Sequence, residues 1–188
     1  MVIPRLKPFL DRHPALQVEL LLDDRRQDLL AEGVDVALRF GALVDSAATA
    51  RRLRSWPRTL AASPGYLAGA PSLTSPADLA AHALIVGPQG VRDWTFRKDG
   101  ATASIRIEGR LRIPVFEGAL AAAVADMGVV LTSTGASRRE FDNGSLVRVL
   151  SDWDMGSVEL HAMFAAGRAA KPSARVFADY LSEVLRDV

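Results

Sequence analysis

The sequence contains no cysteine, and its three histidines stand far apart. Without cysteine the chain has no disulfide and no thiolate chemistry, which fits a reducing cytosol. His13, His82 and His161 show neither the spacing of a metal site nor that of a catalytic nucleophile and base, so we interpret them as packing or surface residues. No Gly-x-Ser-x-Gly frame surrounds Ser63, and no glycine-rich phosphate loop is present. The residues therefore indicate no catalysis, no metal and no cofactor.

Excess charge and long apolar runs are also lacking. The 23 Lys and Arg residues nearly balance 22 Asp and Glu residues, so the net charge of +1 gives no basic field for binding nucleic acid. No apolar stretch is long enough to cross a bilayer, and residues 1–4 do not resemble the start of a signal peptide. We expect a cytoplasmic chain with no membrane partner. Its 188 residues suffice for one large domain or two small ones.

The most informative stretch reads as strand, helix, strand. Residues 18–22 form a short apolar run, which predicts a buried strand. Asp23 can cap a following helix, and Gly33 can end that helix in the left-handed conformation. Residues 34–40 predict a second strand. Two strands joined by a helix across so short a span predict a parallel βαβ unit with a right-handed crossover.

The rest of the chain alternates strands and helices, which predicts an α/β fold. Residues 3–12 predict a helix, residues 58–62 a strand, and residues 116–126 an Ala-rich helix. Asp99-Gly100 lies between two alternating runs and predicts a hairpin. The last helix, opened by Lys171-Pro172, is expected to turn five side chains inward: Val176, Phe177, Tyr180, Leu181 and Val184.

Three segments together resemble the effector-binding domain of LysR-type transcriptional regulators. They are EGVDVALRFG at 32–41, RRL at 51–53 and ASPGYL at 62–67, and their order and spacing agree over nearly the whole chain. The resemblance implies a two-lobed periplasmic-binding-protein-like fold of type II with two crossing strands. Residues 1–62 plus 162–188 would form lobe I, and residues 63–161 would form lobe II.

Ligands of such sheets bind beyond the carboxyl ends of the strands, which directs attention to residues 39–41. Arg39 can clamp an effector carboxylate or form a structural ion pair with Asp35, Asp45 or another carboxylate, and the resemblance favours the structural role. Phe40 offers an apolar wall, and Gly41 an exposed backbone.

A second set of candidates follows from the later strands. Residues 114–116 start a helix whose free N–H groups can bind an anion or simply be capped. The resemblance implies a polar residue such as Asn at this turn. This chain has Pro114 and Val115 instead, followed by Glu117, which argues against a small dicarboxylate effector. The full candidate effector-binding set, expected between the lobes, is Arg39, Phe40, Gly41, Ser63, Pro64, Pro114, Val115, Phe116, Thr132 and Ser133.

The expected function is sensing a small-molecule effector and dimerising, with no catalysis. The resemblance implies a homodimer, or a tetramer in the intact regulator, that binds DNA only through a helix-turn-helix domain outside these residues. The alternatives are a free-standing solute-binding protein of the same fold and a small α/β enzyme. A head-to-tail dimer is expected to use Leu6, Leu10, Val18, Leu20, Ala119, Ala122 and Ala123, unless the Ala face packs inside its own lobe.

The resemblance also implies a further strand upstream of Ile3, lying between residues 18–22 and 34–40. Leu20 and Val36 should then not pair directly, because the two strands would be one strand spacing too far apart. The strands could close up, the gap could open to water, or another segment could fill it. We expect filling, by a partner chain or by residues outside this sequence.

Overall fold

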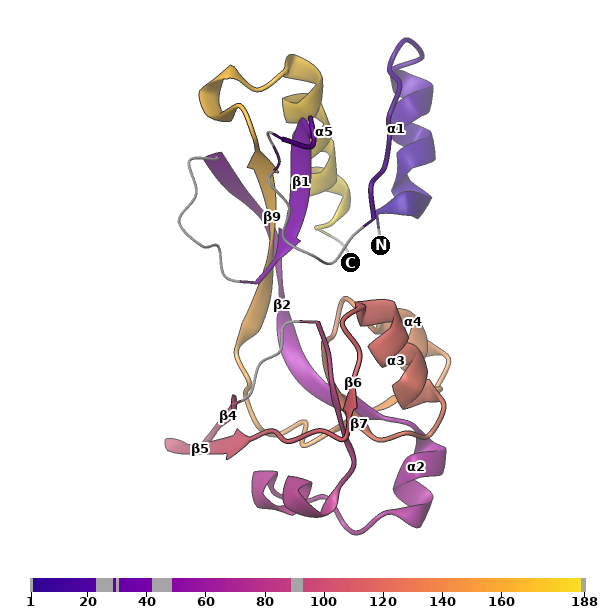
Figure 1. The fold of residues 1–188 in the computed structure, drawn as a ribbon, viewed down its shortest axis with the longest axis vertical. Helices are drawn as coiled ribbons and strands as arrows, with labels where there is room; N and C mark the ends of the chain where they lie inside the picture. Colours follow the sequence, from indigo (N-terminus) through magenta and orange to yellow (C-terminus); the bar gives the residue numbers. More distant parts are fainter. Residues whose placement is uncertain (1, 23–28, 30, 42–48, 89–92, 187–188) are drawn as a thin grey trace. The chain divides into compact units, whose positions relative to one another are not determined.

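The computed structural model describes residues 2–22, 29, 31–41, 49–88 and 93–186. Its contacts divide the chain into two compact units (Figure 1). Unit 1 comprises Met1–Ser55 and Val158–Val188, and unit 2 comprises Trp56–Ser157. The chain therefore passes from one unit to the other twice, within strand β2 (Thr49–Ala62) and at the start of strand β9 (Ser157–Phe164). The lobe boundaries implied by the resemblance stay a prediction.

Unit 1 is organised around β9. Strand β1 (Val36–Phe40) pairs with it antiparallel, from Val36 opposite Phe164 to Phe40 opposite Leu160. Strand β2 follows β9 in the strand order. The helical elements of this unit are the 3₁₀ turn η1 (Ile3–Arg5), α1 (Leu6–Arg12), the 3₁₀ turn η3 (Gly167–Ala169) and α5 (Pro172–Val184).

Helices α1 and α5 pack through aromatic side chains. The buried Phe9 ring lies 5.1 Å from the rings of both Phe177 and Tyr180. The Tyr180 hydroxyl donates a hydrogen bond of 2.7 Å to the carbonyl of Arg5, and the Arg12 guanidinium lies over the Tyr180 ring. The start of the chain is thereby attached to its last helix.

The inward face of α5 differs from the expected one at Val176. Its buried row is made by Ala174, Ala178 and Leu181, a spacing of three to four residues that forms one helical face. Val176 lies two positions from Ala174, on another side of the helix, and is exposed. The prediction that Val176 packs inward is therefore wrong.

The expected parallel βαβ unit is also wrong within the described residues. Residues 18–22 form no strand, and Val18 and Leu20 to Leu22 are exposed. The described ladder of β1 is antiparallel, to β9. Apolar runs are buried only where another element covers them, and no described element covers this one.

The helix expected after Asp23 falls largely outside the described residues, and residues 29 and 31–33 form a turn. Gly33 has φ +66°, and the N–H of Val34 donates a 2.9 Å hydrogen bond to the carbonyl of Leu29. A six-to-one bond across a left-handed glycine is the Schellman arrangement, as expected for Gly33 at the end of a helix.

Leu20 and Val36 are not on paired strands, since Leu20 belongs to no strand. Among the described residues β1 stands at the end of the strand order, with its second edge unpaired. What covers that edge stays a prediction.

Unit 2 is a sheet with helices and a separate hairpin. The second half of β2 pairs antiparallel with β7 (Val129–Ser133) and with β8 (Val147–Val149). Strand β3 (Leu84–Val86) runs parallel to β7 on one side and to β6 (Leu111–Arg112) on the other. The helical elements are α2 (Pro64–Gly69), η2 (Pro76–Ala81), α3 (Phe116–Val124) and α4 (Arg138–Asp142).

The hairpin predicted at Asp99-Gly100 is confirmed. Strands β4 (Asp93–Lys98) and β5 (Ala101–Arg106) pair antiparallel, and the two turn residues have φ +50° and +80°. Positive φ at both central residues is the requirement of the type I′ turn that Asp-Gly favours. Trp94 and Phe96 alternate inward into the core of the unit.

Strand β2 is longer than expected. The predicted strand at 58–62 is the end of one continuous strand that passes through Pro57. Proline lacks the N–H donor but keeps its carbonyl, and the Pro57 carbonyl accepts a 3.0 Å hydrogen bond from the N–H of Thr134.

The Ala-rich helix α3 packs its alanines into the core of unit 2. Ala119, Ala122 and Ala123 of α3 are buried against Ile85 and Val130 of the sheet. They are covered by their own unit and so are not open to a partner chain, which corrects the dimer surface expected from their small size. Close helix-to-sheet approach is the use that these small side chains have here.

The close contact between Gly135 and the Trp56 ring offers a test of the packing in unit 2. A Cβ at Gly135 would lie 2.3 Å from Cδ1 of the buried Trp56 ring, whereas a Cβ at Gly87 would meet nothing within 4 Å. We expect Gly135→Ala to lower the free energy of unfolding by about 1–3 kcal/mol through overpacking, and Gly87→Ala to leave it nearly unchanged. Urea unfolding of both variants measures this. Equal midpoints for the two would contradict the Trp56 contact.

Candidate functional site

The candidate residues of unit 1 lie at the end of β1 and on its neighbours. Arg39 is half-buried and stands directly opposite His161 of β9, so the two side chains share one face of the ladder. Glu159 lies two residues before His161, on the same face of β9. Arg39 therefore shares this face of the ladder with Glu159 and His161, a grouping that the sequence alone did not reveal.

Glu159 is the centre of that group. Its Oε1 accepts a 2.9 Å hydrogen bond from Nη1 of Arg52 on β2, and its Oε2 lies 3.4 Å from Nε2 of His161. His161 is buried, and its Nδ1 has no hydrogen-bond partner within the described part of the chain. Of the ion-pair partners considered for Arg39, Asp35 instead lies 3.0 Å from Nζ of Lys171; Asp45 is outside the described residues.

Phe40 and Gly41 differ in what they can offer a ligand. Phe40 is 47% exposed although it ends a strand whose partner Leu160 is fully buried. Gly41 is buried, with φ +87°, and its N–H donates a 2.9 Å hydrogen bond to the carbonyl of Glu159. The expected exposed backbone at Gly41 is therefore wrong, whereas the apolar surface at Phe40 is present.

In unit 2, Ser63 has a local structural task. It is buried at the N-cap of α2, where its Oγ accepts a 3.2 Å hydrogen bond from the N–H of Tyr66 and donates one of 2.6 Å to Asp126. Pro64 at the first helical position is exposed. Serine followed by proline is a helix-start signature, and it could have indicated this cap from the sequence.

The hydroxyls after β7 are likewise engaged within the unit. Oγ1 of Thr132 and Oγ of Ser137 lie 2.6 Å apart in a buried hydrogen bond. Oγ of Ser133 accepts a 3.3 Å hydrogen bond from the N–H of Ala136. A ligand would have to compete with these bonds to use either hydroxyl.

The turn into α3 is the most open of the predicted positions in unit 2. Pro114 is exposed, Val115 is 49% exposed at the N-cap, and Phe116 is half-buried. No side chain caps this helix end, and Glu117 places a carboxylate in its first turn. The turn thus presents apolar surface, as the sequence indicated.

Two classes of function find no support in the described residues. They contain no group of three His, Asp or Glu side chains that could hold a metal ion. No helix in the described ranges is long and apolar enough to cross a bilayer.

The described residues form two mixed α/β units, and the polypeptide passes between them twice, a connectivity typical of ligand-binding domains. Comparison with known proteins agrees. The family model of the LysR substrate binding domain matches residues 1–186, and the chain belongs to this family.

Individual relatives are transcriptional regulators. The chain is 31% identical over 182 residues to the HTH-type transcriptional regulator PtxR of Pseudomonas aeruginosa, covering 94% of this chain and 57% of that protein. It is 28% identical to YhjC, an uncharacterized HTH-type regulator of Escherichia coli, covering 100% and 64%. The chain thus spans less than two thirds of the length of these relatives.

Solved structures of regulatory domains share the fold. The regulatory domain of CrgA, a LysR-type transcriptional regulator of Neisseria meningitidis, matches with a TM-score of 0.84 at 27% identity, covering 98% of this chain and 92% of that one. The full-length virulence activator AphB of Vibrio cholerae matches with a TM-score of 0.80 at 26% identity, covering 98% and 63%. The periplasmic-binding-protein-like fold expected from the resemblance is confirmed.

The Glu159 network makes stability depend on pH. The hydrogen bond from Arg52, and the charges of Arg52 and His161, hold the pKa of Glu159 below its ordinary 4.5 against a smaller opposing effect of burial. A lowered folded-state pKa stabilises the fold at pH above the ordinary value, and this contribution disappears as the pH falls through the folded-state pKa. We expect Glu159→Gln to be less stable than the wild type at neutral pH, and the difference to shrink as the pH falls below 4.5 and to vanish below the folded-state pKa of Glu159.

The measurement is urea unfolding of both proteins across this range. Glu183→Gln, which removes the same charge from an exposed position on α5 of the same unit, is the control. A constant difference between Glu159→Gln and the wild type at every pH would sink the interpretation.

Proposed function

We propose that this domain binds a small-molecule effector and passes that binding on to a DNA-binding domain elsewhere in the full-length regulator. The family match over residues 1–186 supports this most directly. The named relatives are helix-turn-helix regulators of which this chain spans only part. An effector that binds one arrangement of the regulator better than another shifts the population toward it, by no more than its differential affinity.

The end of β1 is the proposed effector contact in unit 1. Phe40 places an aromatic ring in solvent at the end of β1, whereas its partner in the ladder, Leu160, is fully buried. Val115, at the start of α3, is the corresponding exposed apolar candidate of unit 2. We propose an effector with an apolar part that covers such surface, consistent with Pro114 and Val115 replacing the polar residue that the resemblance implies.

Catalysis is not part of the proposal. The relatives are transcriptional regulators, which also argues against a free-standing solute-binding protein. We propose a cytoplasmic regulator without turnover. Turnover that a point change at Phe40 abolishes would overturn this.

Removing the Phe40 ring tests the effector contact. A thermal-shift screen of small acids and aromatic compounds first identifies a ligand for the wild-type chain. We expect Phe40→Ala to weaken its binding by about three- to tenfold, because an apolar contact is lost, without changing the melting temperature of the free protein. Val176→Ala, which shortens an equally exposed valine on α5, should leave the affinity unchanged.

Titration calorimetry on the three proteins decides the outcome. Unaltered affinity in Phe40→Ala would remove β1 from the site while leaving effector sensing by another surface open to the same screen.

We also propose that the domain self-associates through unit 1. Val18 and Leu20 to Leu22 expose apolar surface along one short stretch, and a contiguous exposed apolar patch marks an interaction site. Leu6 and Leu10 of α1 are half-buried and extend the candidate surface. We propose that a second copy of the chain covers this patch. In a two-fold dimer each contact between the two molecules occurs twice, so one patch on each chain suffices for the association.

A charge placed in this patch tests the association. Leu20 and Val176 are similarly exposed, at 40% and 42%. We expect Leu20→Glu to shift the light-scattering mass of the concentrated protein toward the monomer, and Val176→Glu to leave it as in the wild type. A monomeric wild type, or equal effects of both changes, would count against the patch.

A further inference from the structure

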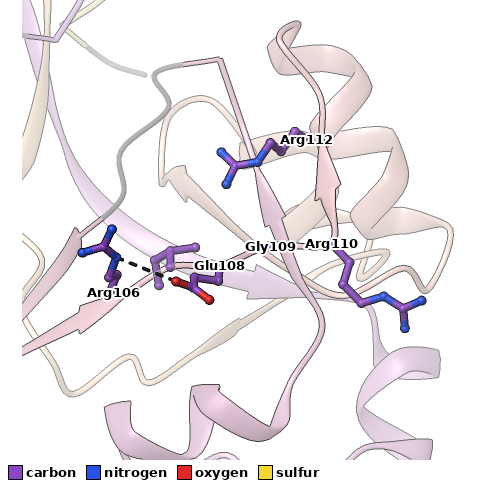
Figure 2. A pocket seen from close by; sticks show the side chains of 6 residues that line it. Arg106, Glu108, Gly109, Arg110 and Arg112 are labelled. Atoms are coloured by element: carbon purple, nitrogen blue, oxygen red, sulfur yellow. Dashed lines mark ion pairs between the residues drawn. The ribbon is translucent and has the colours of Figure 1, made fainter.

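One cavity of unit 2 is lined by none of the candidate site residues discussed so far. It has a volume of about 260 Å³ and is lined by the segment that joins β5 to β6 (Figure 2). Its lining residues are Arg106, Ile107, Glu108, Gly109, Arg110 and Arg112. Three of these six residues are arginines, so the lining is rich in positive charge.

Two residues of this segment, Ile107 and Gly109, hold its backbone against the core of unit 2. Ile107 is buried at 2% exposure and anchors the segment. Gly109 approaches β3 so closely that a Cβ there would lie 2.5 Å from the carbonyl oxygen of Leu84 and 2.6 Å from Cγ2 of Val86. Only glycine allows this approach, and the exposed arginines on either side are thereby carried by a fixed backbone.

The positive charge of the cavity is not neutralised within the described residues. Three arginines against one glutamate leave a formal charge of +2 on the lining. The closest approach of Arg106 to Glu108 is 3.8 Å, between side chains that are 68% and 84% exposed, so the pair contributes little. No ion pair of Arg110 or Arg112 lies within the described part of the chain.

Some other basic side chains of this protein are neutralised by a carboxylate. Arg52, Lys98 and Lys171 each pair with a carboxylate from a distant part of the sequence. In a chain whose charges nearly cancel overall, three arginines within seven residues around one cavity form a local excess. A solvated surface with paired charges would not leave this excess.

The open edge of the sheet adds a backbone N–H donor beside the arginine side chains. Among the described strands β6 is the last in order, paired only with β3. Ile113 directs its N–H to the carbonyl of Val86 at 2.9 Å, so the neighbouring Arg112 directs its own N–H toward the open edge. Figure 2 shows Arg106 and Arg112 reaching to the same side of this segment, with Glu108 near Arg106 and Arg110 directed away.

We propose that this cavity binds a small, multiply charged oxyanion, with Arg106 and Arg112 as the principal ligands. Guanidinium groups bind phosphate and carboxylate oxygens through two parallel hydrogen bonds. A volume of about 260 Å³ is below the usual range of roughly 300–1,000 Å³ for sites of drug-sized molecules, which suits a compact anion. Glu108 repels the anion and competes for Arg106. The proposal does not depend on the proposed effector contact at Phe40.

The lining carries charges of both signs, so removing its arginines and removing Glu108 should change anion affinity in opposite directions. Pyrophosphate and citrate are titrated into the 188-residue chain by calorimetry at low ionic strength, where surface charges are least screened. The wild type should bind at least one of them saturably with one site. Arg106→Gln combined with Arg112→Gln should weaken binding at least about tenfold, and Glu108→Gln should strengthen it.

Arg139→Gln combined with Arg148→Gln is the matched control, since it removes two positive charges from exposed positions on α4 and β8 of the same unit. It should change the affinity by less than either lining variant. Tighter binding of pyrophosphate assigns a phosphate ligand, and tighter binding of citrate a carboxylate ligand. The proposal would be overturned by absence of saturable binding for both probes, by equal losses in the Arg139/Arg148 and the Arg106/Arg112 variants, or by weaker binding by Glu108→Gln.

Discussion

The antiparallel ladder between β1 and β9 is the constraint on which unit 1 depends. It joins residues 36–40 to residues 160–164, and so brings together parts of the chain more than a hundred residues apart. The register places Arg39 opposite His161, and it lets the Gly41 N–H reach the carbonyl of Glu159. A shift of one residue would turn Arg39 to the other face of the sheet and dissolve this polar group.

Features that depend on near neighbours in sequence were predictable. Asp99-Gly100 defines its turn through the φ angles that these two residues tolerate, and Gly33 ends its turn for the same reason. The apolar run at residues 18–22 was not predictable, because burial requires a covering element that the run itself does not encode. Val176 and the alanines of α3 show the same limit: the helix was right in each case, but its inward face is set by what it packs against.

The candidate site residues divide in the same way, into those whose position follows from the local sequence and those whose partners are set by the fold. Phe40 and Val115 were identified from strand and helix ends, and both are exposed. Ser63 and Thr132 were identified as effector contacts, yet a buried hydroxyl must find a partner, and here Asp126 and Ser137 supply it. Glu159 and His161 could not be connected to Arg39 from the sequence, because only the register reveals that they share a face.

The arginine cavity extends this reasoning to charge. Evenly balanced composition says nothing about where charges of one sign gather, because pairing is decided by the fold. The segment from β5 to β6 gathers arginines because Gly109 and Ile107 hold its backbone against the core and leave its charged side chains outside. The same segment leads through Ile113 into α3, where Gly118 packs so closely that a Cβ would lie 2.9 Å from Cγ2 of Ile113. An anion held at Arg112 would therefore bear on the strand that sets the start of α3, and through it on Val115. Any coupling between the cavity and Val115 would run through this contact, and it would be reciprocal: an anion and an effector would change each other's affinity by the same factor.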